Sequence, residues 1–280
     1  MNTIAKKTMT PQQEELDLFL ETIDYRVARS REDLEDSFTL VYQEYLKRGY
    51  VKESDSKLKL SIYNALPSTT TFVAMLEKEV IATTTLIPDS PLGLPMDTLY
   101  HEELNVLRQQ NKKICEISML ASNTELFTSG TSMLLNSKKM MLIFYLFKVI
   151  FDYAKDMVKL DHICITINPK HSLTYDFLLF KDLGGLKTYR NANGAPAIAK
   201  HIDITMAEQE CRQKNKEGLL EMFFFKKTNM EKLAGRITLN PQDLTYFFVE
   251  KTDIFKAAPL LQLGYIKDCY PGYDFGVILD

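Results

Sequence analysis

The sequence predicts a mixed α/β fold, in which helices cover a sheet that contains both parallel and antiparallel strands. Two runs rich in β-forming residues, 69–76 and 80–87, are separated by a polar turn and should form an antiparallel hairpin. Two further β-rich runs, 114–121 and 162–168, enclose a helix at 138–158 that is apolar nearly all round. Strands joined by such a helix lie parallel in a right-handed crossover. The hairpin and the crossover therefore belong to one sheet domain.

The sequence at the beginning of the chain predicts a helix, then a strand, and then a second helix. Residues 1–24 are polar and then mildly amphipathic, and Pro11 stands at a suitable helix start. The run 25–29 is compatible with a short strand. Ser30 is a typical helix cap, and it precedes apolar residues at helical spacing, which are Leu34, Phe38, Val41, Tyr42 and Tyr45.

The sequence of residues 169–204, at the C-terminal end of the sheet domain, predicts one more helix and a closing hairpin. Residues 169–183 have helical character, and we expect this helix to stop at Gly184-Gly185, because glycine readily adopts the left-handed conformation of a helix cap. Strands at 187–190 and 195–204 should then pair around Asn193-Gly194, which is a strong turn signal.

These elements divide the chain into a helical leader at 1–24, a sheet domain at 25–204 and a helical extension at 205–280. Helices are expected at 206–232 and 240–250 of the extension. The sequence leaves its role open, because the extension could cover a pocket, mediate dimerisation or contact a membrane peripherally. The oligomeric state is equally open.

Composition and charge exclude several classes of protein. With 45% hydrophobic and 25% charged residues among 280, the chain should fold into a globular body. A net charge of −3 without a long basic run argues against a broad nucleic-acid-binding face. The four cysteines form no CxxC pair and the four histidines are scattered, so we expect neither disulfides nor a metal site. The most apolar run, 140–151, is too short to span a bilayer and no signal peptide is evident, which predicts a cytoplasmic protein.

Six motifs suggest a family. They are Leu66-Pro67, 88–104, Glu116-Ile-Ser118, Leu120-Ala121, Asn168-Pro-Lys-His171 and Asn193-Gly-Ala-Pro-Ala197. These motifs, spread over roughly two-thirds of the chain, resemble the bacterial long-chain N-acyl amino acid synthases, the N-acyl tyrosine synthase family, which are relatives of the acyl-homoserine lactone synthases. The order of the expected elements also matches the Gcn5-related acyltransferase fold, although element order alone is weak evidence.

The resemblance implies an enzyme that moves a long-chain fatty acyl group from an acyl carrier protein to the α-amine of an amino acid, by direct attack on the thioester. Glu116 is then the expected base, because an α-ammonium must lose a proton before its nitrogen attacks, and a desolvated carboxylate on a central strand is a suitable acceptor. A structural ion pair or hydrogen bond is the alternative role. Ser118 should face the same side of the strand and orient the acid or the amine, or else bond to backbone.

The same resemblance assigns roles on the donor side. Tyr175 would return a proton to the departing thiolate, unless it only packs a helix face. Lys138 and Lys139 would contact an acidic carrier protein, or form a solvated cationic pair. The acyl thioester would be bound by Met119, Leu120, Ala121, Asn168 and His171.

On the acceptor side, the 88–97 loop with Asp89 and Ser90, together with Asn193 of the hairpin, would frame the pocket for the amino acid. Guanidinium groups suit carboxylates, so the arginines are candidate partners for the amino acid carboxylate or ordinary surface residues. The candidates are Arg29, Arg31 and Arg190.

Two departures from the family pattern bear on the substrates. Members that use coenzyme A have a glycine-spaced loop for the pyrophosphate, whereas 122–137 contains only Gly130. The acyl-phosphopantetheine of acyl carrier protein is therefore the expected co-substrate, ahead of coenzyme A, with no permanently bound cofactor. Met119 stands where lactone synthases place an Arg, which argues against lactone synthesis. Two alternatives remain: a coenzyme A-dependent acyltransferase for a small amine, and a non-catalytic sensor that binds acyl groups or carrier protein.

Overall fold

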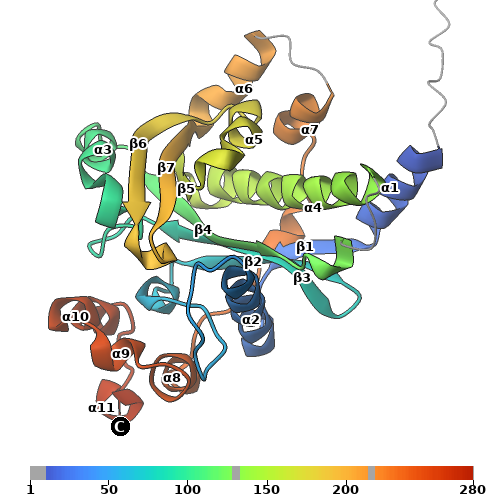
Figure 1. Ribbon diagram of the computed structural model, residues 1–280. Coiled ribbons are helices and arrows are strands. Elements are labelled where there is room, and N and C mark those ends of the chain that lie inside the picture. The colour runs from blue at the N-terminus through green and yellow to red at the C-terminus, as the bar shows by residue number, and fades with distance from the viewer. Residues whose placement is uncertain (1–10, 128–132, 214–217, 280) are drawn as a thin grey trace, which may run out of the picture.

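The computed structural model describes residues 11–127, 133–213 and 218–279, and its frame is a seven-stranded mixed sheet (Figure 1). The strand order is β1-β2-β3-β4-β5-β7-β6, and only β4 and β5 pair in parallel. The expected hairpin, crossover and mixed α/β class are therefore confirmed. The strands are β1 Ile23–Val27, β2 Thr70–Leu76, β3 Glu79–Pro88, β4 Ile114–Ser122, β5 His162–Ile167, β6 Lys181–Tyr189 and β7 Ala195–Asp203.

Helices cover both faces of the sheet. The long helix α4 lies across one face, near α5, α6 and α7, and α2 lies on the other face (Figure 1). The helices are α1 Pro11–Glu21, α2 Arg31–Lys47, α3 Asp97–Gln109, α4 Met133–Asp152, α5 Ser172–Phe177, α6 Ile204–Gln213, α7 Leu219–Phe225, α8 Pro241–Thr245, α9 Ile254–Ala257, α10 Leu260–Asp268 and α11 Phe275–Leu279. Within the described ranges, no helix is long and apolar enough to cross a membrane.

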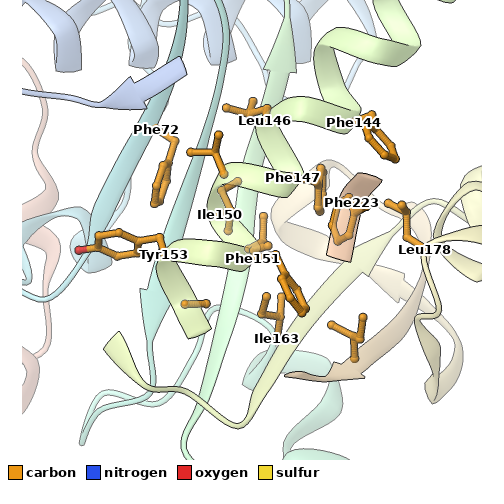
Figure 2. Close-up of a cluster of buried hydrophobic side chains, with 14 of the residues drawn as sticks. Phe72, Phe144, Leu146, Phe147, Ile150, Phe151, Tyr153, Ile163, Leu178 and Phe223 are labelled. Carbon is orange, nitrogen blue, oxygen red and sulfur yellow. The ribbon is translucent and has the colours of Figure 1, made fainter. Parts of the chain in front are cut away.

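The main core lies between α4 and the sheet. Figure 2 shows Phe147, Ile150 and Phe151 of α4 in this cluster, with Phe223 of α7 beside the helix. The rings of Phe151 and Phe223 are 5.5 Å apart between centroids. The nearly uniform apolarity of α4 thus has a physical reason, because the helix is packed between the sheet and a further helical layer.

Strands β4 and β5 separate after a short parallel stretch. Their pairing ends at Ile117 and Ile165, although β4 continues along β3 as far as Ser122. A bulge lies at this point, where Met119 has a left-handed φ of 54° and the Thr84 hydroxyl donates to the Ser118 carbonyl at 2.9 Å. Bulges bend a strand and redirect its side chains. The edge of β4 that faces β5 is consequently free of strand partners beyond Ile117.

The C-terminal helices α8 to α11 pack against the outer side of α2 (Figure 1). Phe38 of α2 meets Phe247 edge to face with centroids 5.5 Å apart. The Tyr270 hydroxyl donates to the Ala65 carbonyl at 2.7 Å, and the Ile237 N–H donates to the Ala28 carbonyl at 2.9 Å. The extension thus shares a hydrophobic cluster with α2.

The prediction of one helix over the whole of 169–183 is wrong. Helix α5 ends at Phe177, the chain turns at Leu179 with a φ of 67°, and β6 already begins at Lys181. Gly184 is not a helix cap but a point of close approach within β6, since a Cβ there would lie 2.4 Å from the Tyr100 ring. The hairpin is confirmed, with left-handed Asn193 between β6 and β7.

Three other boundaries differ from expectation. Strand β1 begins at Ile23 instead of residue 25. The single helix expected at 206–232 is wrong, because α6 ends at Gln213 and α7 starts only after Gly218, whose φ is 71°. The helix expected at 240–250 is present as α8 and a following π-helical turn, Tyr246–Glu250.

Gly184→Ala should destabilise the protein by about 1–3 kcal/mol, because the new methyl group overlaps the buried Tyr100 ring and forces repacking. Urea denaturation measures the change. The control is Gly185→Ala, where nothing lies within 4 Å of the added Cβ. Equal stability of the two variants would contradict the close packing of α3 on β6.

Candidate active site

Glu116 is a buried carboxylic acid in the middle of the sheet, only 2% exposed. Side chains alternate along β4, so Cys115 and Ile117 enter the core beneath α4 while Glu116 faces the opposite side. There the Met96 N–H donates a hydrogen bond to Glu116 Oε2 at 2.7 Å. The carboxyl group thus joins the central strand to the 88–97 loop.

The environment raises the pKa of Glu116 to about 8. Burial is the largest cause, because it disfavours the charged form, and the nearby Asp97 carboxylate acts in the same direction. The Met96 N–H and the Ser118 hydroxyl oppose this shift by hydrogen bonding to the carboxylate. A group with this pKa can accept and release a proton near neutral pH, as a general base must.

Arg108 of α3 fixes the 88–97 loop. Its guanidinium donates to both oxygens of Asp89, at 2.7 and 2.8 Å, and to both oxygens of Asp97, at 2.7 and 2.6 Å. Burial by itself would raise the pKa of Asp97. Hydrogen bonds from Arg108 and the Leu94 N–H outweigh this effect, so the pKa lies below its ordinary value. Both carboxylate oxygens of Asp89, an expected acceptor-pocket residue, are therefore engaged in the ion pair with Arg108.

Tight turns complete this loop. Ser90 Oγ accepts the Leu92 N–H at 3.2 Å. Gly93 has a φ of 71°, and a Cβ there would lie 2.7 Å from Asp97 Oδ2, so both the backbone conformation and the close approach require glycine. The loop is rigid for these reasons, and it holds the Met96 N–H toward Glu116.

Two tyrosines that sequence reasoning did not assign to the site lie close to Glu116. Burial raises the pKa of Tyr63 to about 12, and the Glu116 and Asp97 carboxylates add to the shift. Tyr45, at the end of α2, has a pKa raised by burial, and it interacts electrostatically with both Glu116 and Tyr175. Tyr45 thus interacts with both residues that the sequence predicts to be catalytic.

Tyr175 is buried at the beginning of α5, beyond the end of β5. Its ring meets Phe147 and Phe180 edge to face, with centroids 5.5 and 5.6 Å away. Burial, followed by the effect of Tyr45, raises its pKa, so the phenol stays protonated at neutral pH. Its hydroxyl has no hydrogen-bond partner within the described part of the chain. It is available as a proton donor.

The residues expected to bind the thioester lie around the opening between β4 and β5. Met119 and Ala121 pack toward Leu40 and Val41 of α2, whereas Leu120 packs toward the core beneath α4. Asn168, at the end of β5, caps the next turn by accepting the Lys170 N–H at 3.2 Å. The bulge shifts the alternation of side chains along β4, so that Met119 lies on the α2 side instead of the α4 side that Cys115 and Ile117 face.

A group of basic residues lies near the ends of α2, α4 and α5. Partial burial lowers the pKa of His171, and the positive charges of Lys170, Arg48 and Lys139 lower it further. Burial and Arg48 likewise lower the pKa of Lys139. The ends of α2, α4 and α5 thus bring these four residues together. We call Arg48, Lys139 and Lys170 the cationic rim, because the lowered pKa of His171 favours its neutral form.

Other predicted residues lie elsewhere. Lys138 pairs with Glu15 at 2.7 Å and is not part of the cationic rim. Asn193 donates to the Gly49 carbonyl at 3.0 Å, which holds the hairpin against the end of α2. Arg31 pairs with Asp243 of the extension at 2.6 Å. Residues 128–132 of the 122–137 segment, whose lack of a glycine-spaced loop predicts carrier protein as donor, lie outside the described residues.

No set of three or more His, Cys, Asp or Glu residues in the described ranges could hold a metal ion. Cys115 and Cys164 are buried on adjacent strands, and burial raises the pKa of both thiols. Neither thiol is therefore an activated nucleophile.

The sheet order, the opening between β4 and β5 and the buried acid beside it define an acyltransferase with the Gcn5-related fold. The family model described as N-acyl amino acid synthase FeeM matches residues 36–203, which is more than half of the chain. The chain belongs to the FeeM N-acyl amino acid synthase family.

Several solved structures are similar to this chain. FeeM, an N-acyl amino acid synthase from uncultured soil microbes, is 27% identical with a TM-score of 0.58, over 69% of this chain and 96% of that chain. The acyl-homoserine lactone synthase LasI is 10% identical with a TM-score of 0.49, over 78% and 97% of the chains. BjaI, a CoA-dependent acyl-homoserine lactone synthase, is 15% identical with a TM-score of 0.48, over 71% and 91%. No curated protein sequence matches the chain.

Glu116→Gln should stabilise the protein at alkaline pH. The folded pKa near 8 exceeds the ordinary value of 4.5, so the folded state keeps a proton that the unfolded state loses, and stability falls as pH rises between these values. At pH 9 the variant should be more stable than the wild type by about 3–5 kcal/mol, because the amide carries no charge to bury. Urea denaturation at pH 5 and pH 9 measures this, and a pH-independent difference would refute the raised pKa.

Proposed function

We propose that the protein transfers a long-chain fatty acyl group from acyl carrier protein to the α-amine of an amino acid. The observation that carries the proposal is Glu116, a buried acid with a pKa of about 8 beside the opening between β4 and β5. An amino acid is mostly an ammonium ion at neutral pH, and its nitrogen becomes a nucleophile only after losing a proton. A base with a pKa near the working pH meets this need.

The proposed reaction has no covalent acyl-enzyme. Glu116 accepts one proton from the ammonium group, and the nitrogen then attacks the thioester carbonyl carbon. As the C–N bond forms and the C–S bond breaks, Tyr175 donates its proton to the sulfur and recovers one from the positively charged nitrogen. The proton on Glu116 passes to solvent. Free backbone groups of Met119 to Ala121 stabilise the oxyanion, an interaction worth about 3 kcal/mol.

The cationic rim supports the choice of carrier protein as donor. Its members lie near the ends of α2, α4 and α5, where we expect a pantetheine arm to enter, and cations bind a phosphodiester by charge-assisted hydrogen bonds. Lys139 and the rest of the rim also favour an acidic protein partner. On the acceptor side, the rigid 88–97 loop and the Asn193 hairpin frame the space for the amino acid.

Mass spectrometry of the purified protein with long-chain acyl carrier proteins and the twenty amino acids tests the proposal. The expected product is an N-acyl amino acid, formed on the order of 10²- to 10⁴-fold more slowly by Glu116→Gln. Glu102→Gln, an exposed position on α3, is the matched control and should retain full activity.

Other outcomes separate the alternatives. Product from acyl-CoA, but not from acyl carrier protein, would replace the proposed donor with coenzyme A. Carrier-protein binding without product from any donor or amino acid would instead identify a non-catalytic sensor. A fully active Glu116→Gln enzyme would remove Glu116 as the base.

Ser118→Ala should shift the pH dependence of kcat/KM. The Ser118 hydroxyl lowers the pKa of Glu116, so its removal raises that pKa and moves the alkaline rise in activity to higher pH. A pH profile from pH 6 to 10 measures the shift, with Ser68→Ala on the surface as control. A lower activity with an unshifted profile would mean that Ser118 does not act on Glu116.

A further inference from the structure

A cavity that is partly open to solvent lies on the α4 face of the sheet, away from Glu116. Its volume is about 200 Å³, and it is lined by β1, α4 and the segment that ends α7 and follows it. Its lining is mainly apolar and includes Tyr25, Phe144, Tyr145, Val149 and Met222. Figure 2 shows Phe144 at the side of α4 where Phe223 of α7 also lies.

This cavity is separate from the candidate active site. β1 is an edge strand, and β2 and β3 stand between it and β4. Tyr25 packs toward the core beneath α4, whereas Glu116 faces the 88–97 loop on the other side of the sheet. A ligand in this cavity is therefore not in contact with the reacting atoms.

One wall of the cavity contains buried polar groups. The Tyr25 hydroxyl is buried without a hydrogen-bond partner in the described residues, which is energetically unfavourable unless a ligand supplies an acceptor. Lys148, whose side chain is 6% exposed, pairs with Asp152 at 2.6 Å. Asp152 also accepts the Thr228 N–H at 3.1 Å, which fixes the segment after α7 against α4.

The rim of the cavity is positively charged. Lys226 and Lys227 line it, are exposed, and form ion pairs with no other described residue. Lys232 also lines the cavity but pairs with Asp24 at 2.7 Å. An apolar interior beneath two unpaired lysines is complementary to a ligand with an aliphatic chain and one anionic end.

We propose that this cavity binds aliphatic carboxylates, with the chain among Phe144, Val149 and Met222 and the carboxylate near Lys226 and Lys227. The volume of about 200 Å³ exceeds the roughly 150 Å³ of an apolar cavity that binds benzene, and the open side of the cavity lets the carboxylate end of a longer ligand extend to the lysines. The Tyr25 hydroxyl gains an acceptor in the ligand. The proposal does not rest on the acyltransferase reaction, because it concerns binding alone.

Titration calorimetry of the full chain with octanoate, N-octanoylglycine and octanol tests the proposal. At least one carboxylate should bind in a saturable manner, and Lys226→Gln with Lys227→Gln should weaken that binding about fivefold or more through the loss of charged contacts. Tyr25→Phe should weaken it as well. The double variant should leave octanol binding unchanged.

Matched controls locate the binding. Lys52→Gln with Lys78→Gln removes two exposed lysines elsewhere and should leave the affinity for carboxylates unchanged. Tighter binding of octanoate identifies a free fatty acid as the ligand class, and tighter binding of N-octanoylglycine identifies an acylated amino acid. No saturable binding, or equal affinity in the Lys226 and Lys227 double variant, would overturn the proposal, whether or not the enzyme transfers acyl groups.

Discussion

The hydrogen bond from the Met96 N–H to Glu116 is the interaction on which the candidate site depends. A carboxyl group buried in the middle of a sheet is unfavourable when ionised, and this donor is one of two that partly offset the penalty. The Met96 N–H is in place because the loop around it is fixed. Arg108 donates hydrogen bonds to both aspartates of the loop, and Asp97 also accepts a hydrogen bond from the Leu94 N–H. A surface ion-pair network thus controls the proton affinity of an interior acid.

The two faces of the sheet carry different kinds of residue. The α4 side provides a thick hydrophobic core, whereas the α2 and α3 side carries the acid, the rigid loop and the tyrosines around them. The bulge at Met119 shifts the alternation of side chains where β4 leaves β5. Met119 consequently lies on the α2 side, although Cys115 and Ile117 of the same strand lie on the α4 side.

Much of this arrangement could be predicted from the sequence. The crossover from β4 to β5, the buried acid at Glu116 and the rigidity of the 88–97 loop depend on local patterns of apolar residues, proline and glycine. Arg108 and Tyr45 could not be assigned, because their positions depend on how α3 and α2 pack, although Tyr45 ends a regular series of apolar residues on its helix. The helix expected to reach residue 183 failed for a related reason. Leu179 takes a left-handed turn that tertiary burial of its neighbours compensates, and the glycines after it serve packing against Tyr100.

The contact between α2 and the C-terminal helices limits where the chain can be shortened. The family match ends at residue 203, yet Ala28, Leu34 and Phe38 are buried by residues of the extension, among them Phe247. A chain trimmed to the residues that the family model matches would expose these apolar side chains of α2 to water and favour self-association. Boundaries for recombinant expression should therefore follow the hydrophobic cluster and keep the last helices, even though sequence similarity stops well before them.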